Sequence, residues 1–453
     1  MCSSDLTGSG NMSIRAGGGL FFSSRLTGLF LNDASISSPF SLRIDLIDSP
    51  KGATQIGNLT NPLGTNASGA DYSSFTNGFP QRYILKNLPK NPPFVANPTV
   101  FGLQPGVRWI TPEIYDYNIT FERQLRGDTV IHASYVGTTG VHLRQDVNVN
   151  PAPYIAGSTL NDQQRRPFQP FGIIYQEREN ARNGYNAAQF DLEKRPAGGT
   201  GILNQITLLA NYTYSKAMDY GLAENGGITD LGTSLGSGMS YGNPGQKAFE
   251  TGPASYDHAN RVVASYVWTL PKLTQSNGFI RNVVGGWQWT GIYSFQTGDP
   301  LTILAGVDRS QSGNNLDRAD LVNGATSGSR ANPTACPTGT TSVIHCQAWL
   351  NNSNFFSPKS TAPDGSFGNV GKGTYRGPNL WDVDTGLLKN FTPVRNHESV
   401  NFQFRGEFFN LFNHPQWQDP NVTTTNANFG TIRATIGTNA DSRIIQLALK
   451  MNF

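Results

Sequence analysis

The sequence predicts an all-β fold, namely an antiparallel up-and-down transmembrane β-barrel that is incomplete. Ten segments alternate apolar and polar residues with a period of two, and long connections alternate with short ones along the chain. The composition agrees: of 453 residues, 11% are aromatic and only 14% are charged, with 50 glycines and 27 prolines. Many aromatic residues and turn formers with few charges favour β-strands that lie in lipid.

The ten predicted strands follow this alternation in chain order. They span 12–22, 113–125, 128–137, 185–195, 203–216, 259–271, 285–297, 380–391, 398–411 and 442–453. In the second, Tyr117 and Ile119 point to one side, whereas Asn118 and Thr120 point to the other. A transmembrane strand needs roughly 9–11 residues, so these strands are long enough to cross a bilayer at a tilt.

The connections give an independent signal. The long ones are 23–112, 138–184, 217–258, 298–379 and 412–441. The short ones are 126–127, 196–202, 272–284 and 392–397. Because the two kinds alternate, every long connection lies at the same end of the predicted sheet. Transmembrane barrels have this asymmetry, with long extracellular loops and short periplasmic turns.

The last strand carries a further pattern. Its apolar row consists of Ile445, Leu447, Leu449, Met451 and Phe453. Gln446, Lys450 and Asn452 lie on the opposite side. A strand that ends on an aromatic residue resembles the closing strand of bacterial outer-membrane barrels. That resemblance implies an assembly signal for the barrel assembly machinery, and the alternative is an amphipathic strand of a soluble sandwich.

Charged residues within the predicted strands are expected to face the lumen, because a charge on the lipid-facing side is costly. These residues are Asp191, Glu193, Arg261, Asp382, Asp384, Arg405 and Glu407. Three roles remain open for them: pairing with one another, contact with an internal domain, or lining a solute path. Arg405 and Glu407 are two residues apart on one face and are expected to interact.

No catalytic, cofactor or metal site is predicted. The G-x-S-x-G match at 232–236 lies in a Gly/Ser-rich loop without the strand and helix that a nucleophile elbow requires. Acidic residues between Asp308 and Asp320 offer oxygen ligands, but their spacing is not that of an EF-hand and a solvated loop is the simpler interpretation. Cys336 and Cys346 are expected to form a disulfide in an oxidising compartment, with two free thiols as the alternative.

Charge and hydropathy exclude other classes. The net charge of +3 is too small to predict nucleic-acid binding. No run of 18 apolar residues is present, which excludes a transmembrane helix. Residues 1–11 are expected to be non-native or disordered, and 12–453 to be the C-terminal part of a barrel. Since no signal peptide precedes the first strand, the natural N-terminus is expected to be missing.

Several segments resemble a known family in family order. They are Tyr117–Leu125, Ala133–Leu143, Asn183–Arg195, Ala210–Asp219, Asn260–Pro271, Gly286–Pro300 and Phe404–Pro415. The chain thereby resembles TonB-dependent outer-membrane receptors, and in particular the Oar-like kind with a carboxypeptidase-regulatory-like front domain. The resemblance implies a 22-stranded barrel in the outer membrane of a Gram-negative bacterium, of which this chain supplies about ten strands.

The same resemblance implies a function. The complete barrel would take up a solute through an N-terminal plug that the TonB system remodels, and neither plug nor TonB box is visible in this sequence. Solute contacts are expected in 138–184, 217–258 and 298–379, although the solute itself is not identifiable. Two alternatives remain: a passive porin-like channel and a surface β-sandwich adhesin.

Overall fold

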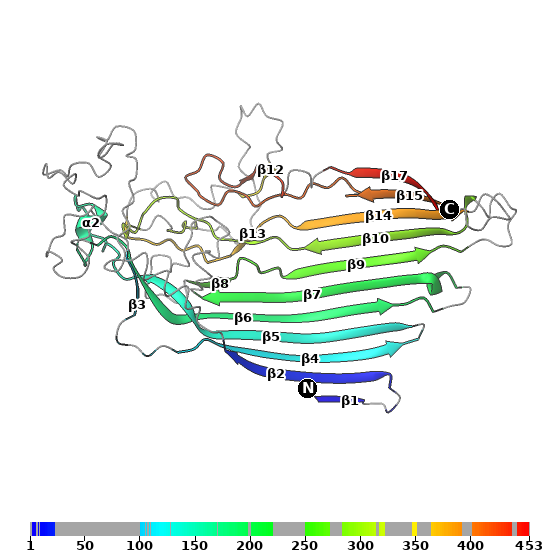
Figure 1. Ribbon diagram of the computed structural model, residues 1–453. Coiled ribbons are helices and arrows are strands. Elements are labelled where there is room, and N and C mark those ends of the chain that lie inside the picture. The colour runs from blue at the N-terminus through cyan, green and yellow to red at the C-terminus, as the bar shows by residue number, and fades with distance from the viewer. Residues whose placement is uncertain are drawn as a thin grey trace, which may run out of the picture.

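One large antiparallel sheet dominates the computed structural model (Figure 1). The structure describes residues 2–5, 8, 10–22, 100–104, 106, 108, 110–126, 128–169, 171–197, 201–220, 250–271, 283–313, 317–321, 347–350, 364–391, 401–436 and 442–452. No helix in this part of the chain is long and apolar enough to span a membrane.

Each long strand pairs with the next long strand along the chain. The long strands are β2 (Met12–Phe22), β4 (Glu113–Leu125), β5 (Thr129–Asn148), β6 (Ile174–Lys194), β7 (Ile206–Tyr220), β9 (Asn260–Thr269), β10 (Trp287–Gln296), β14 (Leu380–Phe391), β15 (Asn401–Phe409) and β17 (Ile444–Asn452). Their order in the sheet is β2-β4-β5-β6-β7-β9-β10-β14-β15-β17, with every pair antiparallel. The predicted up-and-down topology is therefore confirmed, and all ten predicted strands are present.

The sheet differs from prediction at several places, including the parallel pairing of β3 (Val100–Leu103) with β6 and the pairing of β8 (Thr251–Pro253) with β7. β1 (Cys2–Asp5) pairs with β2 and adds a short strand in the segment expected to be non-native or disordered. β5 and β6 pair far beyond the predicted bounds of 128–137 and 185–195, with register irregularities between Gly140 and Gln145. The glycines and threonines of 137–140 suggest a turn, but the apolar alternation resumes after the bulge and the backbone stays paired.

Apart from a 3-10 helix, η3 (Ile202–Gln205), at the short connection before β7, the minor elements lie where the long connections are (Figure 1). They are β3 (Val100–Leu103), the short helix α2 (Asp162–Arg165), β8 (Thr251–Pro253), β11 (Pro300–Leu301), β12 (Gln347–Ala348), β13 (Tyr375–Arg376) and β16 (Thr431–Ile432). β11 pairs with β13 near the two ends of one long connection, and β12 pairs with β16 and so joins that connection to the next long one. We call the described residues of these connections, 149–173, 250–259, 297–379 and 410–436, the loop layer.

The buried hydrophobic core lies in the loop layer rather than on the sheet. Ile303, Val370 and Phe429 are almost completely buried and pack with Leu301 and Tyr375. Side chains of the strands, by contrast, stay exposed in large numbers. A water-soluble protein would bury its apolar strand faces first, so this distribution is opposite to that of a soluble sheet.

The register divides the sheet into two faces of different chemistry. Because directly paired residues point the same way, one face can be followed from strand to strand. What we call the apolar face includes Ile119, Tyr135, Phe190, Ala210, Ala264, Leu387, Phe404 and Leu449. The opposite, polar face includes Glu122, His132, Asp191, Asn211, Thr290, Gln403 and Lys450.

Charged residues on the apolar face lie near the short connections and, at Arg182 of β6 and Lys216 of β7, on the side of the loop layer. Arg123, Lys194 and Lys389 lie near the short connections. The Lys389 ammonium donates to the carbonyl of Gly285 at 2.6 Å and lies over the ring of Trp287. Long basic side chains that reach from an apolar surface to a polar boundary behave in this way.

Aromatic residues also border the apolar face at both ends. Near the short connections, Trp268 and Trp289 have ring centroids 6.0 Å apart, and Trp287 lies 6.1 Å from Phe404. Near the loop layer lie Tyr214, Phe295 and Trp381, and Ala210, Ala264 and Val383 lie between the two groups. This distribution corresponds to the two aromatic girdles of transmembrane barrels.

Two strand glycines allow aromatic rings to lie across the apolar face. A Cβ at Gly137 would come within 2.2 Å of the Tyr117 ring, and one at Gly291 within 2.6 Å of the Tyr266 hydroxyl. Both glycines sit directly opposite the tyrosine that covers them. A glycine in a strand permits this close approach, and a larger side chain at either position would displace the ring.

Candidate functional site

All seven strand charges singled out in the sequence lie on the polar face. In β6 and β9, Asp191 pairs with Asn211 of β7, Glu193 with Leu209, and Arg261 with Thr213. The remaining four, Asp382, Asp384, Arg405 and Glu407, share that face across β14 and β15. The structure therefore brings the seven onto one surface but spreads them over several strands.

Their contacts are mostly with neutral groups. Asn211 donates to the Asp191 carboxylate at 2.5 Å, and Asp384 accepts the Asn410 backbone N–H at 2.8 Å. Glu193 accepts from Arg195 at 2.7 Å, outside the set. Arg405 and Glu407, expected to interact, form no ion pair in the described structure. Mutual pairing is therefore not what holds these charges.

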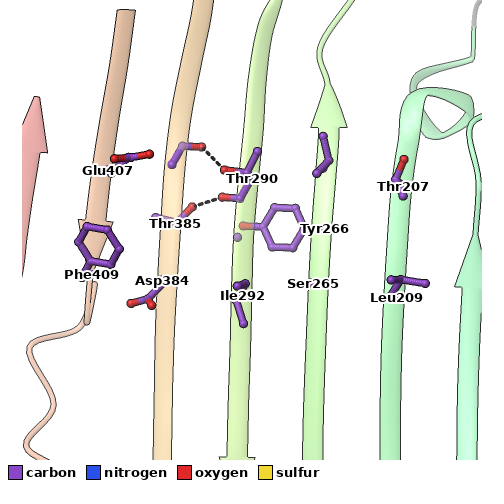
Figure 2. Close-up of a pocket in the computed structure, with 13 residues that line it drawn as sticks. Thr207, Leu209, Ser265, Tyr266, Thr290, Ile292, Asp384, Thr385, Glu407 and Phe409 are labelled. Atoms are coloured by element: carbon purple, nitrogen blue, oxygen red, sulfur yellow. Dashed lines mark hydrogen bonds between the residues drawn. The ribbon is translucent and has the colours of Figure 1, made fainter. Parts of the chain in front are cut away.

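A groove runs across the polar face over β7, β9, β10, β14 and β15 (Figure 2). Its volume is about 400 Å³. The register sets Leu209, Ser265, Ile292, Asp384 and Phe409 in one row across the five strands. The groove is therefore built from the sheet itself, with no contribution from the loop layer.

Apolar side chains form most of the exposed surface of this groove. Ile292 is 53% exposed, Leu209 46%, Phe409 40% and Val267 38%. Two carboxylates, Asp384 and Glu407, complete the lining, and no Lys or Arg belongs to it. An exposed apolar patch with a polar border is typical of a binding surface. A sequence signal was present for three of them, since Leu209, Ile292 and Phe409 are apolar exceptions on otherwise polar strand faces, whereas β9 carries both Val263 and Val267 on that face.

Buried ion pairs hold the loop layer together. Lys372 pairs with Asp219 at the end of β7, and Arg376 pairs with Asp257. Arg318 and Glu250 are both almost fully buried and lie 3.3 Å apart. Each pair joins segments more than 60 residues apart. Such long-range pairing is not readable from a single sequence.

A tight acidic turn forms within this layer between Asp308 and Asp317. The Ser310 hydroxyl lies 3.1 Å from the Asp308 carboxylate and 3.0 Å from that of Asp317. Asp317 also accepts the Ser310 backbone N–H at 2.6 Å, and Asp308 accepts that of Gly313 at 2.8 Å. These oxygens serve as acceptors for the turn, and no cluster of metal-ligating residues occurs in the described part of the chain.

Burial changes the protonation of this turn. Asp317 is 3% exposed, and desolvation raises its pKa to about 6, opposed by the hydrogen bonds from Ser310 and assisted by the charge of Asp308. Desolvation also raises the pKa of Asp308. The turn therefore holds a proton in mildly acidic solution that an ordinary aspartate would have lost.

The C-terminal strand presents its apolar row on the apolar face. Leu447 is 68% exposed, Leu449 63%, Ile445 54% and Met451 50%. β17 pairs with β15 and ends the order of the sheet, with no second partner strand in the described residues. Phe453, Cys336 and Cys346 lie outside the described residues, so the assembly signal's last residue and the disulfide stay predictions.

A family model described as "Outer membrane beta barrel domain" matches residues 3–446. Among solved structures, the outer membrane transporter YddB from Escherichia coli is similar at 11% identity and a TM-score of 0.42, covering 100% of this chain and 40% of that one. The pyoverdine outer membrane receptor FpvA from Pseudomonas aeruginosa follows at 9% identity and 0.34, covering 76% and 30%. The FrpB iron transporter from Neisseria meningitidis is similar at 12% and 0.31, covering 78% and 32%. No curated protein matches this chain.

Proposed function

Because this chain belongs to the outer membrane β-barrel domain family and is thus an outer-membrane protein, we propose that it supplies barrel wall and extracellular loops to a solute transporter. The observation that carries the proposal is the division of one up-and-down sheet into a mainly apolar face and a polar face. The apolar face contacts hydrocarbon, and the polar face, with its seven charges, lines the wet interior.

The transporter is of the TonB-dependent kind. This part of the proposal rests on the sequence segments that resemble those receptors, from Tyr117–Leu125 to Phe404–Pro415. The described sheet is open, and lipid does not tolerate the bare edge of a sheet. The chain spans 30–40% of the length of the similar structures reported above. Further strands and a plug that the TonB system remodels would complete the protein.

Sidedness follows from the connections. The loop layer lies outside the cell, where it meets the solute, and the short connections lie in the periplasm. The apolar row of β17 serves as the signal for the barrel assembly machinery. No bond of the solute is broken in this function, so the protein acts as a transporter and not as an enzyme.

Energised uptake can be tested with the full-length gene in a host outer membrane. Cells with and without the protein would be given a complex growth medium, and depleted solutes measured by mass spectrometry before and after addition of a protonophore. We expect a solute too large for porins to disappear only while the proton gradient is intact. Depletion that continues after the gradient collapses would support the porin-like channel, and a protein extracted without detergent would support the sandwich adhesin.

A further inference from the structure

We propose that the groove on the polar face binds small organic cations that carry an apolar body, such as amphiphilic ammonium compounds. The inference rests on the proposed function, because it places a binding site on the inner wall of the transporter. It goes further than that function by assigning a place and a ligand chemistry. Three properties of the groove support it: its apolar surface, its charge and its size.

The apolar surface is continuous across five strands. Leu209 and Ile292 lie in one register row with Phe409, and Val267 lies in the next row beside Thr290. All four apolar side chains are more than a third exposed. Apolar surface that remains in water gains roughly 25 cal/mol for each Å² that a ligand covers. The polar face thus contains one place where an apolar body binds favourably.

Both charged side chains that line the groove, Asp384 and Glu407, are acidic. Glu407 has no hydrogen bond or ion pair to any residue that the structure describes, although it lines the groove. Asp384 accepts one backbone N–H, from Asn410. No basic side chain lines the groove. A ligand ammonium would therefore supply a positive charge that no residue of the lining provides.

The size fits a small molecule rather than a folded domain. A volume of about 400 Å³ lies in the range of small-ligand sites. Gly386 keeps β14 in its floor free of a protruding side chain. A Cβ at Gly386 would meet the Thr290 hydroxyl at 3.0 Å, so even alanine would begin to fill the space. Both walls and floor thus leave room for an organic cation.

The reaction of a reporter cysteine tests the proposal without a known solute. Ile292→Cys would be introduced into the full-length protein with Cys2, Cys336 and Cys346 replaced by serine. Its labelling rate would be measured with two methanethiosulfonate reagents, one that carries a trimethylammonium group and one that carries a sulfonate group. Each rate would be divided by the rate of the same reagent with a free thiol in solution. We expect a preference for the cationic reagent of about fivefold, the size of a surface charge effect.

Matched variants show whether the groove causes this preference. Glu407→Gln is expected to reduce it at least twofold, whereas Glu122→Gln, on the same face but paired with Arg15 outside the groove, leaves it unchanged. Phenethylammonium is expected to slow the labelling of Ile292→Cys, and 3-phenylpropanoate is not. Heat-modifiable migration on gels would confirm that each variant is folded.

Three results would overturn the proposal. They are an absent cation preference, equal effects of the two glutamine variants, and a folded protein whose Ile292→Cys does not react at all. The last would mean that polypeptide covers the groove. The proposed function can fail separately. It would be contradicted if no solute were depleted from the medium while labelling of the groove kept its charge preference and its protection by phenethylammonium.

Discussion

Asp317 is the residue whose environment most alters its chemistry. Its carboxyl is buried in the turn with Ser310, and its pKa is raised to about 6 from an ordinary value of 3.8. A folded-state pKa above the unfolded value means that the folded state holds the proton more tightly. The associated stability is fully present below about pH 4 and is lost as the pH rises through about 6.

This difference predicts a pH-dependent loop layer. Hydrogen exchange of the amides of 302–313, corrected for intrinsic exchange rates, gives the free energy of local opening. Between pH 4 and pH 6.5 this free energy should fall by up to about 3 kcal/mol. Asp317→Asn keeps the carbonyl acceptor without the charge and should flatten this dependence. Asp128→Asn, at an exposed carboxylate outside the loop layer, serves as the control. Unchanged pH dependence in Asp317→Asn would contradict the assignment.

Lys372 gives a second prediction at this scale. Its ammonium and the Asp219 carboxylate are both buried, and they join the loop layer to β7. Removing one partner of a buried pair leaves an uncompensated charge and costs about 3–5 kcal/mol. Lys372→Met should therefore lower the denaturant midpoint sharply, and adding Asp219→Asn should restore part of the loss. A double variant no better than the single one would show that the two residues do not act as a pair.

At the scale of the element, β17 shows how strand alternation encodes environment. Leu447 and Leu449 are exposed on the apolar face, whereas Gln446, the residue directly before Leu447, lies on the polar face. A one-residue shift of register would place every one of these side chains on the wrong face. The pattern that predicts the strand therefore also fixes its pairing with β15.

Substitutions in β17 should separate the two faces. Leu447→Arg places a charge in hydrocarbon and should cost about 2–4 kcal/mol near the bilayer centre. Gln446→Arg, its neighbour on the polar face, should cost little. The folded fraction can be measured by heat-modifiable migration after urea titration in lipid vesicles. Equal losses in the two variants would mean that the apolar row of β17 does not contact lipid.

Most of the wall could be predicted from the sequence, whereas the loop layer could not. Strand period, connection length and the closing pattern are local, so β2, β4 and β14 have the predicted bounds. The parts of β5 and β6 nearest the loop layer were not predicted, because Gly137 and Gly140 suggest a turn. Pairs such as Arg318–Glu250 depend on the three-dimensional meeting of distant segments, and no local pattern announces them. The groove was predictable in part: its apolar exceptions can be read in single strands, but their alignment across five strands depends on the register.

For the whole molecule, the alternating connections predict sidedness. Tyr256, in the loop layer, and Arg195, beside a short connection, are both exposed. On intact cells, a polyethylene-glycol maleimide too large for porins should label Tyr256→Cys at once and Arg195→Cys only after the outer membrane is permeabilised. Cys2, Cys336 and Cys346 would be replaced by serine in both. The reverse pattern would invert the orientation proposed for the barrel.

The cross-braced loop layer also bears on how the immune system or a phage would see this cell surface. Its outward shape is composed of segments from several connections, held in place by Lys372, Arg376 and Arg318. An antibody that recognises this shape would bind a discontinuous epitope, and peptides copied from one connection would be poor immunogens for it. Vaccine or phage-receptor engineering would therefore have to transplant the connections as a set.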